Sequence, residues 1–75
     1  SIETKKAQDI EQLEKAVSFY TRMDPAAAAL SIVNLDQKTA VNILVRMKDK
    51  QASAVLESMT AERSSELIDA IARKR

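Results

Sequence analysis

Hydrophobic and small residues recur every twelve positions from Met23 onward. The openers of four successive segments are Met23, Leu35, Met47 and Met59. The fifth place after each opener is small, the residues being Ala28, Ala40, Ala52 and Ser64. The eighth and ninth places are aliphatic with one polar exception, the pairs being Ser31 with Ile32, Ile43 with Leu44, Val55 with Leu56, and Leu67 with Ile68. So short a repeat predicts stacked units that share one core, as in folds that bind partners.

One continuous helix is incompatible with this repeat. A helix turns by about 100° per residue, so twelve residues leave a residual rotation of about 120° and successive repeats would face three directions. A break in each repeat lets every short helix turn its apolar side inward. The capping residues expected at the breaks are Asp24 with Pro25, Asp36, Asp49 in place of Lys48, and Thr60. We therefore expect residues 23–75 to form a right-handed superhelix of about four short helices.

The apolar places of the repeat define the expected core. Its members are Met23, Ile32, Leu35, Ile43, Leu44, Met47, Val55, Leu56, Met59, Leu67 and Ile68. Methionines can also form adaptable binding surfaces. Because Leu35 occupies the same repeat place as Met47 and Met59, we interpret these methionines as core residues at helix junctions.

Residues 1–22 differ from the repeats and predict one charged helix of about six turns. Three-four-three spacing marks a candidate seam of Ile10, Leu13, Val17 and Tyr20. This stripe either packs on the repeat array or forms a coiled coil, with a homodimer as one outcome. We expect its C-terminal half to pack on the array and its N-terminal half to enter a longer coiled coil. Removal of residues 1–19 is then expected to lower the oligomeric order without unfolding the array.

Composition supports an all-α fold and argues against an enzyme. The chain of 75 residues has no glycine, cysteine or histidine and a single proline, Pro25. These absences disfavour hairpins, phosphate-binding loops and the usual nucleophile and metal constellations. A net charge of +1 predicts no general affinity for nucleic acid. The chain starts at Ser1 and contains no apolar run of membrane-spanning length. We expect it to be a fragment, so its lack of a targeting signal says nothing about the parent protein.

Charged and polar residues provide two candidate surfaces. Glu62, Glu66 and Asp69 share one helical face, which we interpret as solvated rather than as a metal site, because dedicated sites need more converging ligands. No catalytic residue, metal ligand or cofactor is therefore expected. The polar residues near the helix starts are expected to lie together along one edge, forming a candidate partner surface of Gln37, Lys38, Lys50, Gln51, Glu62 and Arg63.

The stretch from Tyr20 to Ile71 carries a family resemblance. It follows the pattern Tyr-x-x-Met-x-Pro-x-x-Ala-Ala, with further repeats opening at Leu35 and Met47. This pattern resembles the MgtE intracellular N-domain superfamily of short-helix superhelices. Within that superfamily, a charged helix running directly into the motif is similar to periplasmic flagellar motor proteins of the MotE and FlbB type. Ser31 departs from the pattern, because an aliphatic residue is expected at that place.

The resemblance implies a structural role without catalysis. Proteins of the MotE and FlbB type have an N-terminal membrane anchor, a coiled coil and this module in the periplasm. The implied partner is another protein, a flagellar stator or other periplasmic motor component, which the module binds or stabilises as a chaperone does. Membrane attachment would come only through an upstream anchor. The alternative is the cytosolic magnesium-sensing domain of an MgtE-type transporter, although no metal ligand of that domain can be matched here.

Overall fold

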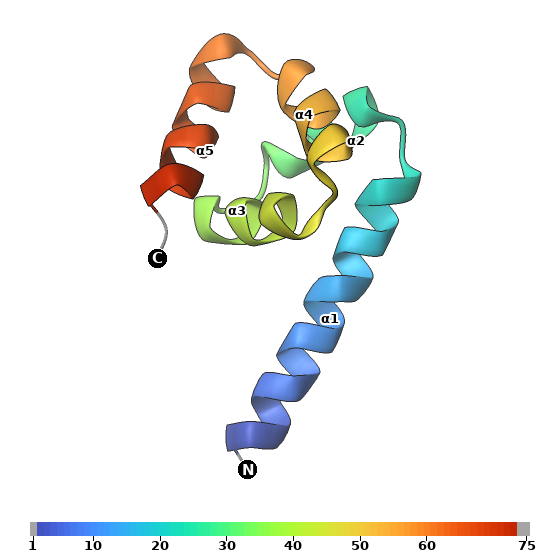
Figure 1. Cartoon of the computed structure of the whole chain (residues 1–75). Helices are drawn as coiled ribbons and strands as arrows, with labels where there is room; N and C mark the ends of the chain where they lie inside the picture. Colours follow the sequence, from blue (N-terminus) through green and yellow to red (C-terminus); the bar gives the residue numbers. More distant parts are fainter. Residues whose placement is uncertain (1, 74–75) are drawn as a thin grey trace.

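Five helices account for nearly all of the chain (Figure 1). The computed structural model describes residues 2–73, with side chains from residue 5 onward. The helices are α1 (Ile2–Arg22), α2 (Pro25–Ile32), α3 (Gln37–Arg46), α4 (Asp49–Glu57) and α5 (Ala61–Arg73). No strand occurs in the described range, so the predicted all-α class is confirmed. Figure 1 shows the four shorter helices packed together, with α1 extending away from them toward its N-terminal end.

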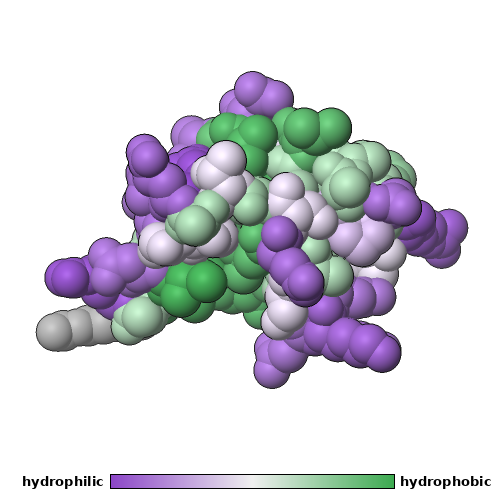
Figure 2. All heavy atoms as spheres, turned by 90° about the horizontal axis from the view of Figure 1, so that it is seen from above, coloured by the Kyte–Doolittle hydropathy of each residue, from purple (hydrophilic) through white to green (hydrophobic). Residues whose placement is uncertain are grey.

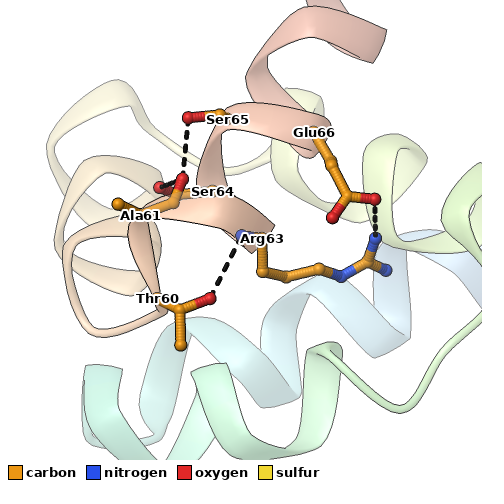
Figure 3. A network of polar contacts seen from close by, with 6 residues as sticks. All are labelled: Thr60, Ala61, Arg63, Ser64, Ser65 and Glu66. Carbon is orange, nitrogen blue, oxygen red and sulfur yellow. Dashed lines mark hydrogen bonds and ion pairs between the residues drawn. The ribbon is translucent and has the colours of Figure 1, made fainter.

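Three of the four short helices begin at a side-chain cap of the expected kind. The carboxylate of Asp24 accepts a hydrogen bond from the N–H of Ala26 at 2.9 Å. The capping contacts of the other two are Thr39 N–H to Asp36 Oδ1 at 2.9 Å and Arg63 N–H to Thr60 Oγ1 at 3.1 Å, the latter drawn in Figure 3. Each cap satisfies a backbone donor that has no partner within the helix. The breaks predicted between repeats are therefore encoded locally.

The fourth break differs from the prediction. The sequence predicts that Asp49 caps α4, but Lys48 is the N-cap residue and makes no side-chain capping bond. Asp49 is instead the first helical residue, where its negative charge faces the positive end of the helix dipole. The twelve-residue period places Lys48 at the capping position even though its side chain has no oxygen to accept a hydrogen bond.

The Asp36 cap predicts a specific loss of stability in acid. Hydrogen bonds from the N–H and then the hydroxyl of Thr39 lower the pKa of Asp36 below its usual 3.8. The stabilisation is therefore complete above pH 3.8 and is lost as the pH falls through the lower folded-state pKa. Asp36→Asn keeps a good cap that cannot ionise. We expect the melting temperature of this variant to fall less steeply with decreasing pH below 3.8 than that of the native chain. Equal pH dependence of the two melting temperatures would contradict this prediction.

Each helix packs mainly against the second helix after it. The principal pairs are α1 with α3, α2 with α4, and α3 with α5, while sequential neighbours contact one another less. This alternation follows from the period, because consecutive short helices must change direction to turn their apolar sides toward the same core. The buried hydrophobic core consists of Ala28, Ala29, Ile32, Ala40, Val41, Ile43, Leu44, Met47, Val55 and Leu67.

Small residues at the fifth place of the repeat are required by close helix packing. Ala28 and Ala40 are both 0% exposed, whereas the adjacent Ala27 is exposed. Ala28→Leu would force three additional carbons into this contact and is expected to destabilise the fold by about 1–3 kcal/mol. Ala27→Leu is the matched control and should change stability by less than about 0.5 kcal/mol. Urea denaturation of the two variants measures the difference, and equal effects would show that the interior tolerates a larger side chain.

Two residues expected in the core are exposed, and three lie at its margin. Met23 is 38% exposed because it follows the end of α1, in the turn that leads to α2. Ile68 is 51% exposed on α5, beyond which no further helix packs within the described residues. The expected core residues that are only partly buried against the cluster are Leu35, Leu56 and Met59.

The second half of α1 belongs to the packed structure. Leu13, Val17 and Tyr20 contact the buried cluster, whereas Ile10 remains 47% exposed. The Tyr20 hydroxyl lies 2.8 Å from Ser31 Oγ, within hydrogen-bonding distance. This contact explains why Ser31 occupies a place that is aliphatic in the other repeats, since a partly buried tyrosine hydroxyl needs a polar partner. The candidate seam is therefore divided between the array and solvent.

Candidate interaction surface

An open apolar groove lies between α4 and α5, with the end of α3 as its third wall. Its larger part has a volume of about 500 Å³ and is lined by Leu44, Val45, Asp49, Ala52, Ser53, Leu56, Ile68 and Ile71. An adjoining hollow shares Ser53, Leu56 and Ile68 and adds Glu57 and Ser64. We refer to the two together as the α4–α5 groove.

Helical spacing places these side chains on facing stripes. On α4, the groove residues follow one another at three-, one-, three- and one-residue intervals along one face; they are Asp49, Ala52, Ser53, Leu56 and Glu57. On α5, the groove residues Ser64, Ile68 and Ile71 are spaced by four and three. The two stripes face each other across a floor that includes Leu44 at the end of α3. Local helix geometry thus creates an apolar channel with polar residues along its rim.

The groove exposes large hydrophobic side chains to solvent. Val45 is 45% exposed and Ile68 is 51% exposed, while Leu56 between them is partly buried. Figure 2, which views the molecule from above, shows hydrophobic surface (green) reaching solvent beside strongly hydrophilic side chains (purple). Clustered exposed hydrophobic residues with a polar rim are typical of interaction sites, whereas single exposed ones are ordinary.

The charge of the groove is negative. Asp49 and Glu57 are exposed at opposite ends of α4 and line the groove, and no lysine or arginine is among the described residues that line it. Over the described part of the chain, neither carboxylate forms an ion pair. The groove therefore combines an apolar interior with two carboxylates that have no cationic partner in the fold.

The predicted partner surface is distributed over several hollows instead of one edge. Five of the six residues predicted from the helix starts line three different hollows. Gln37 and Lys38 line one with Ala70 and Arg73, Lys50 and Gln51 line a second with Tyr20 and Met23, and Arg63 lines a third with Leu30 and Val33. Glu62 is exposed and lines none of them. These residues line different hollows because successive short helices change direction, and a common partner surface stays a prediction. Figure 1 shows that the starts of α3, α4 and α5 point to different sides of the molecule.

The acidic face of α5 is partly neutralised by arginines. Arg63 lies 3.7 Å from Glu66, as drawn in Figure 3, and Arg73 contacts Asp69 at 3.0 Å. Within residues 2–73, no three histidine, cysteine, aspartate or glutamate side chains are grouped so that they could hold a metal ion. Figure 3 also shows that the hydroxyls of Ser64 and Ser65 donate to the carbonyl of Ala61 in the first turn of α5.

Sequence reasoning missed the α4–α5 groove, although one signal was present. The tenth place after each opener is Val33 and Val45 in the first two repeats but Glu57 and Asp69 in the last two. A change from aliphatic to acidic at one repeat place indicates that its surroundings change along the array. The core predicted from the sequence includes Leu56 and Ile68 because that prediction treats all repeats as equally covered.

Comparisons with known proteins find no matching family model, no matching characterised protein and no matching solved structure. A search for membrane-spanning helices finds none that is long and apolar enough over the described residues.

Proposed function

We propose that this chain is a non-enzymatic protein-interaction module. The observation that carries the proposal is the α4–α5 groove, in which the exposed side chains of Val45 and Ile68 lie together with Leu56 and Ile71. Burial of apolar surface drives most protein association. A rigid groove that keeps such side chains exposed loses little conformational freedom on binding, which favours recognition of a partner.

We further propose that the module is presented at the end of a coiled coil. Support comes from the first half of α1, in which every described side chain from Lys5 to Gln12 is exposed to solvent. An exposed helix of this kind is marginal in isolation and gains stability from a second helix. Ile10 is the large apolar residue of this exposed stretch and is available for that contact.

The cellular setting follows from the resemblance of the repeat. The entry motif from Tyr20 to Pro25, preceded by a charged helix, supports a role in the bacterial flagellar motor. In that setting the module lies in the periplasm and binds or stabilises a stator component or another motor protein. The parent protein would be held at the inner membrane by an anchor upstream of the module.

Protease accessibility of the parent protein tests the compartment. The parent is exposed to protease in intact cells, in spheroplasts and after lysis, with a known cytosolic protein as the control. Cleavage in spheroplasts but not in intact cells is the expected result. Protection until lysis would contradict the periplasmic setting. In that case, a rise in melting temperature with millimolar magnesium but not with sodium at equal ionic strength would indicate the magnesium-sensing alternative.

Motility tests the motor role independently of compartment. Cells whose parent protein lacks residues 23–75 are compared on soft agar with cells carrying the complete protein at matched expression. The proposal expects reduced swimming although flagella are assembled. Unchanged motility would remove the motor role while leaving an interaction function in another system.

A further inference from the structure

At two places of the repeat, exposure increases toward the end of the array, whereas the eighth-place residues Val55 and Leu67 stay buried. At the ninth place, Ile32 is 0% exposed and Leu44 is 2% exposed, Leu56 is partly buried and Ile68 is 51% exposed. The fifth place follows the same order, since the first two alanines are 0% exposed and the last two residues, Ala52 and Ser64, are partly exposed. Similar side chains thus go from complete burial to half exposure along one molecule.

The order of helix packing explains this gradient. The side chains of α2 are covered by α4 and those of α3 by α5, because each helix packs on the second one after it. Within residues 2–73, no helix follows α5 to cover α4 in the same way. The α4–α5 groove is therefore the place that one more helix of the array would occupy, and its apolar stripe already has the spacing for that contact.

The rim of the groove indicates what kind of helix fits. The tenth repeat place is Val33 and Val45 in the first two repeats but Glu57 and Asp69 in the last two, and Glu57 lines the groove. Asp69 is paired with Arg73, whereas Glu57 has no ion pair over the described range. Unpaired carboxylates beside an apolar channel attract a partner with complementary positive charge and penalise one with negative charge.

A second copy of the chain fits this surface poorly. A symmetric contact places the same patch of both copies face to face. Here it would bring Asp49 and Glu57 of one copy toward the same carboxylates of the other, with no lysine or arginine among the described groove residues to offset the repulsion. This repulsion disfavours a symmetric dimer, and the negative rim of the groove favours a helix that carries basic residues.

We propose that the α4–α5 groove binds a short amphipathic helix of a partner protein, which completes the helical array in trans. Asp49 and Glu57 are eight residues apart on α4, so the groove accommodates a segment of about 12 Å, or roughly two helical turns. The partner helix carries aliphatic side chains at three- and four-residue spacing and lysine or arginine at its flank. The inference rests on the proposed interaction function and identifies its binding site.

Site-specific photo-crosslinking in cells tests the proposal on the full-length parent protein. A photoreactive phenylalanine derivative replaces Ile68, and the matched control carries it at Ala27, an exposed position on α2 outside the groove. Mass spectrometry then identifies the peptide attached at each position. The expected product at position 68 is a segment of another protein with amphipathic helical spacing and basic residues, and it should be absent from the control.

Charge reversal provides the second readout. Glu57→Lys is expected to lower the crosslinking yield at position 68 by about tenfold, since it replaces attraction by repulsion at the rim. Glu14→Lys changes an exposed carboxylate of α1 outside the groove and should leave the yield unchanged. Circular dichroism of both variants checks that they are folded. Equal yields for the two variants would overturn the charge complementarity.

Two other crosslinking results would overturn the proposal. A crosslink from position 68 to this protein's own sequence would place a second copy or another segment of the chain in the groove and overturn the proposal. No crosslink above the control would show that the groove is unoccupied in cells. If deletion of residues 23–75 still impairs motility in that case, the interaction function stands and another surface performs it.

Discussion

Leu67→Ala is expected to destabilise the protein by about 2–5 kcal/mol, while Ile68→Ala should cost less than about 1 kcal/mol. The two residues are adjacent on α5 and similar in size, but Leu67 is 0% exposed and Ile68 is 51% exposed. Truncation of a buried side chain leaves a cavity, whereas truncation of an exposed one removes few contacts. The two substitutions therefore measure the effect of burial on stability with side chains of similar size and chemistry.

The effect of Leu67→Ala should be close to complete unfolding. The free energy of unfolding of a domain is about 0.05–0.15 kcal/mol per residue, so that of a chain of 75 residues is small. Urea denaturation followed by far-ultraviolet circular dichroism measures both variants. Leu44→Ala, at a buried place of the second repeat, should behave like Leu67→Ala. A cost below about 1 kcal/mol at both buried leucines would contradict the packing of the array.

Deletion of residues 1–19 is expected to abolish cooperative folding, whereas deletion of residues 1–9 should preserve it. Leu13, Ala16 and Val17 pack against the core, and burial of a large aliphatic side chain contributes about 1.5–3 kcal/mol. Their removal also uncovers the side of α3 that α1 contacts. By contrast, the described side chains of residues 5–9 are exposed.

This expectation replaces the one drawn from the sequence, in which the array survives the loss of residues 1–19. Thermal melts of the two truncated chains make the comparison, with the complete chain as reference. A sharp transition in the longer deletion would show that the four short helices fold without α1. Loss of the transition in the shorter deletion would show that the exposed half of α1 contributes to the fold.

The positions of the helix breaks could be predicted because their causes are local. Asp24, Asp36 and Thr60 provide capping oxygens within three residues of the backbone donors that they satisfy. Only Lys48 deviates, since the period sets the break there without a side-chain cap. Capping depends on neighbours in sequence, so it is visible before the fold is known.

Burial of the N-terminal seam depends on which surface each turn of the helix contacts. The spacing of Ile10, Leu13, Val17 and Tyr20 is uniform, and the sequence left open whether the stripe contacts the array or another chain. The structure packs the last three on the array and leaves Ile10 exposed. Spacing identifies an apolar stripe, but the length of the surface that covers it is a property of the whole fold.

The amino-acid sequence by itself determined the helical class, the period and the points where each helix begins, because these depend on residues within one or two turns of each other. Only the tertiary structure decided which apolar residues are covered. Ile32 and Ile68 occupy the same repeat place, yet one is 0% and the other 51% exposed. The physical reason is that Leu67 on α5 faces the core, whereas Ile68 lines the α4–α5 groove, which no further helix covers within residues 2–73.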